Sequence, residues 1–437
     1  MALPSLRQFL LLVLAALAFS LAFYKSSRAP APAPFQWPTQ ILDPDDFVAK
    51  MRTRFVSPRQ NVSTHAASLL EMNDGRIRAF WFSGSREGAA DVEIRTAVFD
   101  PELDKWSDDV SIVDRNTTQR ALLRFVKKIG NPVPLRTPDG TLQLFYVTVS
   151  VGGWAGSSIT VITSTDEGTT WGPPRRLVTS PFINISTLVK GSPFAYNDRT
   201  IGLPVYHEFI GKFGELLRLS PSGEVIDKQR LSSGRLGIQP VMLIKNQQQA
   251  IILMRHTGTS QKRVIATATA DAGRHWSAPE LTTLANPDAA VSGVALSDGR
   301  ILVALNDTEM NREVLSLAAS SDGGASWKTI YVLEDQREQI TDPVRYLQLS
   351  EELARATDSN ITDPSAYAAS AQRNKCTGQS CQFEFSYPYM IQTRNGDLHL
   401  VYTWNRSFIK HVSFSSTWLI QRLNESAIGT SPNAQLH

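Results

Sequence analysis

The chain has 437 residues, of which 42% are hydrophobic, and its 44 Lys and Arg nearly balance its 41 Asp and Glu, leaving a formal net charge of +3. Because these charges nearly balance, the chain lacks the strong excess of basic residues that is typical of a nucleic-acid-binding protein. The length and composition are those of a globular protein that can bury a large core.

The N-terminal region precedes the globular part. Residues 9–23 form an apolar run after a segment whose only side-chain charge is Arg7. Such a run is typical of a secretory signal or a short membrane anchor, whereas a full span needs about 20 apolar residues. The Ala-Pro repeat at 29–34 is typical of a semi-rigid spacer. We expect a signal peptide or membrane anchor at 1–24 and a linker at 25–48. The rest would be exported to the periplasm or another extracytoplasmic face.

Six hairpins follow, each with two apolar strands joined by a polar turn. Several turns are Asp-Gly or Asn-Gly, the strongest short-range hairpin signal. The starts lie 47 to 66 residues apart, except for a last gap of 95, which is typical of four-stranded blades with loop insertions. The first strands begin at His65, Asn131, Ser192, Gln239, Ser292 and Tyr387. The pattern predicts an all-β protein, a six-bladed β-propeller over 49–423, with a tail at 424–437.

Three of the units carry the same aspartate-box signature, Ser/Thr-x-Asp-x-Gly-x-x-Trp, at 164–171, 269–276 and 320–327. Each box supplies an Asp that closes a turn, a Gly that tolerates a positive φ, and a Trp that can fold over the turn. We interpret the boxes as structural clips.

The long last gap contains an insertion at about 334–385. Segments beginning at Ser350 and Pro364 have helical patterns, so the insertion should be partly helical. The chain has two cysteines, Cys376 and Cys381, which in an exported protein are expected to form a small disulfide loop. Because the insertion leads into the strand at Tyr387, we expect it to overhang one rim of the propeller.

Propeller geometry brings first-strand starts and second-strand ends to the same rim. Polar and ionisable side chains gather at those positions, whereas the boxes fall on the opposite rim. Besides the first-strand starts, this rim carries Arg86, Asp91, His207, Glu208, Arg255, Arg312, Trp404 and Arg406. The histidines lack metal-ligand spacing, so we expect no metal site and no cofactor.

The boxes, the blade order and several rim residues resemble the sialidase (neuraminidase) superfamily, in its bacterial-neuraminidase-repeat branch, over about 60–420. The resemblance implies that Arg255 and Arg312 bind the substrate's carboxylate, for which the planar guanidinium fork is suited. It implies that Arg86 is an additional rim arginine, Asp91 the acid/base, and Tyr387 the nucleophile. A neutral phenol is a sensible nucleophile beside a substrate carboxylate.

Two positions depart from the family pattern. His65 stands where the family has its first carboxylate-binding arginine, and Gln239 stands where it has the glutamate that activates the tyrosine. Because a glutamine cannot accept the phenolic proton, another base is needed, and Glu208 is the first candidate and Glu384 the second. Asn131, His65, Gln239, His207, Trp404 and Arg406 are expected to contact the substrate.

Three functions remain open from the sequence. The first is an exported, exo-acting glycoside hydrolase on acidic sugars such as sialic or related nonulosonic acids. The second is a lyase or hydrolase of uronate-containing polysaccharide, with His65 or His207 as base and Tyr387 as acid. The third is a non-catalytic, membrane-tethered glycan-binding propeller. All three predict an acidic glycan as the partner.

Overall fold

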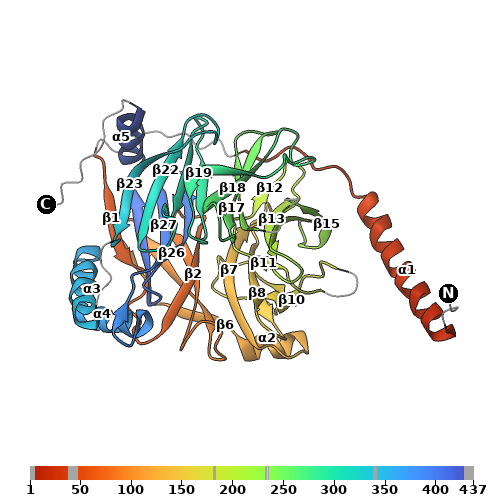
Figure 1. Ribbon diagram of the computed structural model, residues 1–437, viewed down its shortest axis with the longest axis horizontal. Helices are drawn as coiled ribbons and strands as arrows, with labels where there is room; N and C mark the ends of the chain where they lie inside the picture. The colour runs from red at the N-terminus through yellow and green to blue at the C-terminus, as the bar shows by residue number, and fades with distance from the viewer. Residues whose placement is uncertain are drawn as a thin grey trace.

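The computed structural model describes residues 5–37, 48–180, 184–231, 234, 236–337 and 342–427. Six antiparallel sheets form the blades of a β-propeller, shown in Figure 1. Inner strands of successive blades contact one another around the ring, and the last inner strand returns to the first. The predicted six-bladed, all-β architecture is therefore confirmed.

The blades follow the chain in order. The first consists of β2 (Ser63–Glu71), β3 (Ile77–Gly84), β4 (Glu93–Asp100) and β5 (Lys105–Trp106), with β6 (Val110–Asp114) also paired to β4. The second consists of β7 (Lys128–Arg136), β8 (Leu142–Val149), β9 (Ser157–Ser164) and β10 (Arg175–Arg176). The third consists of β11 (Leu188–Val189), β12 (Phe194–Ala195), β13 (Ile201–His207), β14 (Phe213–Leu219) and β15 (Val225–Arg230).

The remaining blades repeat this plan. The fourth consists of β16 (Gly237–Ile244), β17 (Ala250–His256), β18 (Arg263–Thr269) and β19 (Glu280–Ala285). The fifth consists of β20 (Ser292–Ala295), β21 (Ile301–Leu305), β22 (Val314–Ser320) and β23 (Lys328–Asp335). The sixth consists of β26 (Phe385–Gln392), β27 (Leu398–Trp404), β28 (Phe408–Phe414) and β1 (Met51–Phe55).

Strand β1 closes the ring, a feature that the hairpin pattern did not predict. It precedes the first blade in sequence but pairs with β28 as the outer strand of the last blade, with Met51 opposite Phe414. The first and last segments of the propeller therefore share one sheet, and backbone hydrogen bonds hold the ring shut.

The aspartate boxes form the turns between third and fourth strands. In the first box, Asp166 accepts hydrogen bonds from the hydroxyl of Ser164 at 2.7 Å and the amide of Thr170 at 2.9 Å. Gly168 has a φ of +83°, and the Trp171 indole donates to its carbonyl at 3.1 Å. The box at Asp322 repeats these contacts. These contacts support the interpretation of the aspartate boxes as structural clips.

The insertion contains two helices, α3 (Pro343–Thr357) and α4 (Pro364–Lys375), as the sequence predicted. Each begins with Asp-Pro: the aspartate side chain caps the helix and the proline takes the first helical position, where its missing N–H costs nothing. A short hairpin of β24 (Cys376–Thr377) and β25 (Ser380–Cys381) follows, closed by the predicted disulfide.

Three further helices lie outside the blades. They are α1 (Leu6–Ser27), α2 (Arg115–Leu122) and α5 (Ser416–Ala427). Within the described part of the chain, no helix has both the length and the apolar character needed to cross a membrane. The linker does not stand free, because Phe35 is completely buried among residues of the third and fourth blades and pairs with Tyr196.

Candidate functional site

Four inner strands bulge at the predicted rim. Pairing registers shift in β2, β7, β16 and β26, and at each shift a non-glycine residue has a left-handed backbone. These residues are Ala66, Asn131, Gln239 and Tyr387, with φ between 47° and 56°. Such backbones cost about 1–3 kcal/mol each and cluster at functional sites. In three of the bulges a proline follows, which has no N–H to leave unpaired.

The bulges bring polar side chains to two phenols. Gln239 Nε2 donates to the hydroxyl of Tyr387 at 3.1 Å and to that of Tyr206 at 3.4 Å. Asn131 Nδ2 also donates to Tyr206, at 3.5 Å. Burial raises the pKa of Tyr206 well above its usual value, so this second phenol stays neutral.

The Tyr387 hydroxyl lies between an amide and a guanidinium. Arg255 donates through one nitrogen to both Tyr387 Oη and Gln239 Oε1, each at 3.3 Å. Because a guanidinium can only donate, the amide oxygen of Gln239 must face Arg255, and its nitrogen then faces the phenols. Among the described residues, no carboxylate accepts a hydrogen bond from Tyr387. Neither of the two candidate bases, Glu208 and Glu384, contacts the phenol through a hydrogen bond here.

Arg255 and Arg312 converge on one residue, Asp288. The carboxylate of Asp288 accepts from Arg255 Nε at 2.6 Å, and its carbonyl oxygen accepts from Arg312 at 2.6 Å. The two guanidinium groups, which come from different blades, therefore meet at the same rim. Asp288 therefore fixes the position of both guanidinium groups.

Arg406 joins this group through Glu384. Glu384 is buried and lies 2.8 Å from Arg406 and 3.5 Å from Arg312. Its other oxygen accepts from Lys375 at the end of α4, at 2.7 Å. Burial alone would raise the pKa of Glu384, but the surrounding cations outweigh it and hold that pKa well below the usual range. The insertion thus reaches the rim, and Glu384 orients its cations. We call Arg255, Arg312, Arg406, Tyr387 and Gln239 the rim cluster.

His65 packs directly against Tyr387. Their ring centroids are 4.1 Å apart, and His65 Nδ1 lies 2.8 Å from the hydroxyl of Thr403. Burial, and then the charge of Arg406, lowers the pKa of His65 well below its usual value. The imidazole is therefore neutral at pH 7, and it does not replace the missing arginine as a cation.

Lys190 also lies near Tyr387, between β11 and β12. Its ammonium donates to the carbonyl of Pro388 at 3.0 Å and faces the rings of Tyr387 and Tyr389, at 5.8 and 5.2 Å. The residue is buried, and burial lowers its pKa to about 7. It tethers the bulge that carries the nucleophile candidate.

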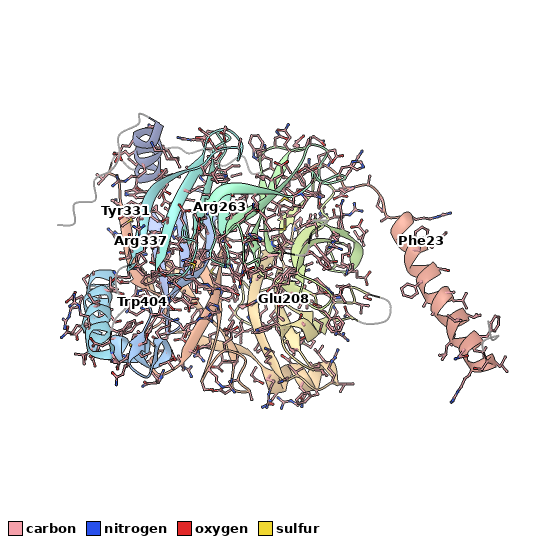
Figure 2. All side chains as sticks on the ribbon, in the orientation of Figure 1. Phe23, Glu208, Arg263, Tyr331, Arg337 and Trp404 are labelled. Atoms are coloured by element: carbon pink, nitrogen blue, oxygen red, sulfur yellow. A yellow bond between two sulfur atoms is a disulfide. The ribbon has the colours of Figure 1, made fainter. Side chains whose placement is uncertain are left out.

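Glu208 lies near the cluster, in the loop after β13. Figure 2 labels it beside the strands of the third blade. Burial raises the pKa of Glu208, and Arg255 and Lys128 are among the charges that act on it. Lys128 in turn covers the ring of Trp154 at 3.8 Å. A half-buried carboxyl of raised pKa has the properties of a proton donor or acceptor.

Four predicted site residues share no hydrogen bond or ion pair with the rim cluster in the described part of the chain, although Glu87, next to Arg86, pairs with Arg406 at 2.6 Å. Arg86 and Asp91 are exposed, and Ser85 donates twice to the Asp91 carboxylate. Slight burial opposes ionisation of Asp91, but these bonds outweigh it and lower its pKa. His207 stacks on Phe213 with centroids 4.7 Å apart. Trp404 is completely buried against Phe55 beside the insertion helices (Figure 2), so it presents no surface to a substrate.

Sequence reasoning missed Asp288 and Lys190. Asp288 follows Asn286-Pro287 just before an inner strand, and Lys190 comes just before Ser192-Pro193, where the inner strand of the third blade breaks. A proline near the start of an inner strand recurs around the ring. This pattern would have indicated that Asp288 and Lys190 lie at the rim. Among the described residues, no group of three or more His, Cys, Asp or Glu side chains could hold a metal ion.

Comparison with protein families gives one match, to the BNR repeat-like domain, over residues 75–400. The chain belongs to the BNR repeat-like family. No curated protein matches it in sequence.

Solved structures similar to this BNR repeat-like propeller share its fold at low identity. A Hadza microbial sialidase, Hz136, is 14% identical with a TM-score of 0.57, over 80% of this chain and 65% of its own. A protein of unknown function from Dyadobacter fermentans is 12% identical with a TM-score of 0.56, over 83% and 98%. The intramolecular trans-sialidase from Ruminococcus gnavus is 11% identical with a TM-score of 0.55, over 82% and 95%. The chain spans about two thirds of the length of the first.

The family match includes Gln239, Arg255, Arg312 and Tyr387 of the BNR repeat-like propeller. His65 and Arg406 lie outside the matched range, and both belong to blades at the point where the ring closes. Four members of the rim cluster thus lie within the matched range, and Arg406 lies beyond its end.

Proposed function

We propose that the protein is an exo-acting glycoside hydrolase of sialidase type on acidic sugars. The observation that carries this proposal is the Tyr387 hydroxyl held at 3.3 Å from Arg255, with Arg312 held on the same Asp288. A sugar carboxylate placed against these arginines brings its anomeric carbon toward the phenol. The arginines then supply positive charge where the carboxylate binds. The phenol supplies a neutral nucleophile at the anomeric carbon, where positive charge develops in the transition state.

Proton transfer follows from the ionisable groups nearby. In hydrolysis the phenol gives its proton to a base as its oxygen bonds to the anomeric carbon, and the leaving-group oxygen receives a proton as its own bond to that carbon breaks. The raised pKa of Glu208 favours it as the base that takes the phenolic proton. Asp91 remains the acid that the family resemblance implies, and it would have to leave Ser85 to act.

A second function is favoured by the contact between His65 and Tyr387. In β-elimination from a uronate, the neutral imidazole takes the C5 proton and the phenol protonates the leaving oxygen, with the C4–O bond breaking as the double bond forms. Arg255 and the Gln239 amide would neutralise the carboxylate by hydrogen bonds. This reading gives a role to both residues that depart from the sialidase pattern.

The test is turnover of a panel of fluorogenic acidic glycosides and of uronate polysaccharide by wild type and Tyr387→Phe. Tyr331→Phe, on an outer strand of the fifth blade, is the matched control. Hydrolysis that is lost in Tyr387→Phe and kept in the control supports the proposal. Release of an unsaturated product that absorbs in the ultraviolet supports elimination. If the wild-type protein turns over none of these substrates, hydrolysis and elimination are both contradicted, and glycan binding is the function that remains.

A further inference from the structure

Large apolar side chains are exposed on the loops around the rim cluster. They are Leu123 (93% exposed), Val151 (77%), Met310 (76%), Ile210 (65%), Phe125 (60%) and Phe209 (60%). Each lies in a loop that precedes a first strand or follows a second strand, and therefore on the rim-cluster face. The opposite face presents Leu103 and Val48 among the described residues. The two faces of the ring thus differ strongly in exposed apolar surface.

Five of these side chains come from neighbouring blades, the second and the third. A hydrogen bond from Lys127 to the carbonyl of Gly152, at 3.3 Å, joins the loops before β7 and after β8, and the loop after β13 belongs to the adjacent third blade. The side of the ring formed by the sixth and first blades is covered instead by the insertion, whose Arg373 contacts Asn61. These five apolar loop tips therefore form one sector, which we call the apolar crown, and Met310 lies apart from it on the fifth blade.

Basic side chains are interleaved with the apolar crown. Arg120 is exposed in the last turn of α2, just before Leu123, and Lys127 and Lys212 are exposed in the loops that carry Phe125 and Ile210. Isolated apolar tips among cations are typical of surfaces that rest in the headgroup region of a bilayer, where apolar side chains enter the acyl boundary and cations meet anionic lipids. A protein partner normally fits a continuous, packed apolar patch instead.

We propose that the apolar crown docks on an anionic lipid surface, so that the rim cluster faces the membrane. The charge pattern fits an anionic lipid surface, because three exposed cations lie around the apolar tips. Without such a surface, water contacts these apolar side chains. A site held in this way acts on acidic glycans displayed at a membrane. The proposal concerns binding and does not depend on the reaction that the rim cluster performs.

The experiment uses the full chain with a single added cysteine. Both native cysteines are in the disulfide, so a thiol-reactive, environment-sensitive fluorophore labels only the new position. Val151→Cys reports on the apolar crown, and Leu103→Cys, 74% exposed on the opposite face, is the matched control. Each labelled protein is mixed with vesicles of phosphatidylcholine, with and without phosphatidylglycerol. Brominated lipid serves as the quencher.

The expected result is a blue shift and quenching at position 151 on vesicles with phosphatidylglycerol, weakened by salt, and neither at position 103. Phe209→Ser with Ile210→Ser should weaken this response about tenfold or more, whereas Leu103→Ser should not change it. Binding through α1 alone would tether the protein without a response at position 151. Three results would overturn the proposal. They are vesicle binding without a fluorescence change at position 151, an equal change at positions 151 and 103, and no change at either position. The thermal unfolding of each variant shows that it is folded.

Discussion

At the scale of single residues, Gln239 decides which chemistry the site can perform. Its amide donates to the Tyr387 hydroxyl, where a glutamate would accept the proton. If the site hydrolyses acidic glycosides, Gln239→Glu should raise turnover about tenfold or more, because it adds a general base beside the phenol. Steady-state kinetics measures this, with Gln248→Glu on an exposed turn as the control.

A fall in turnover for Gln239→Glu would contradict hydrolysis through an activated phenol. It would mean that the amide donors are needed, as they are when Gln239 holds a substrate carboxylate during elimination. The same variant therefore separates the two candidate reactions.

Lys190 makes stability depend on pH. Burial lowers its folded pKa to about 7, whereas an unfolded lysine titrates near 10.4. Between these values the unfolded chain binds more protons, so the free energy of unfolding rises with pH over this window and is lower below pH 7. Lys190→Met should remove this rise, and any stability that it gains at pH 6 should shrink toward pH 10.

Urea unfolding across this pH range tests the prediction, with the exposed Lys105→Met as control. Parallel curves for wild type and Lys190→Met would show that the buried amine does not titrate in the folded state.

Residue positions in the sequence indicated much of the rim cluster but not its contacts. First-strand starts and second-strand ends placed Gln239, Arg255 and Tyr387 on one rim, and they hydrogen-bond to one another. The same rule placed Trp404 there, yet strand alternation turns its ring into the core. The place of a residue along its strand determines which rim it lies on. The direction of its side chain depends on bulges, which no local sequence pattern shows.

At the scale of elements, the aspartate boxes stabilise turns through ionised carboxylates. Hydrogen bonds from Thr170 and Ser164 lower the pKa of Asp166 to about 2, below the value near 3.9 of an unfolded aspartate. Their stabilisation is complete above about pH 4 and is lost as pH falls toward about 2. Asp166→Ala should therefore lower the urea midpoint at neutral pH, and the difference from wild type should shrink in acid.

The measurement is the urea midpoint from pH 7 down to the lowest pH at which wild type folds. Glu224→Gln, in a turn outside the boxes, is the control. A difference between wild type and Asp166→Ala that does not change with pH would contradict the role of the ionised carboxylate.

Elements with strong local signals were predicted, and those that depend on distant partners were not. The Asp-Pro starts of α3 and α4 and the Asp-Gly turns carry their own conformational preference. The inner strand of the third blade is broken into β11 and β12 around Lys190, and Gly191 in this gap lies against the carbonyl of Pro240 in the next blade. No sequence window contains that contact.

At the scale of the whole molecule, the ring closes through pairings between chain segments far apart in sequence. Strand β1 joins β28, and Phe35 of the expected spacer is buried on the third and fourth blades. A five-residue strand and a single aromatic carry little signal until their partners are in place. Closure also assembles the site, because His65 of the first blade packs against Tyr387 of the sixth only when these two blades meet.

The account's central claim is that arginines from separate blades bind one carboxylate beside Tyr387. Calorimetric titration with N-acetylneuraminic acid, glucuronic acid and their methyl esters tests it most directly. We predict that at least one acid binds about tenfold or more tightly than its ester, and that Arg255→Met abolishes this difference. Equal binding of every acid and its ester by the wild-type protein would contradict the claim.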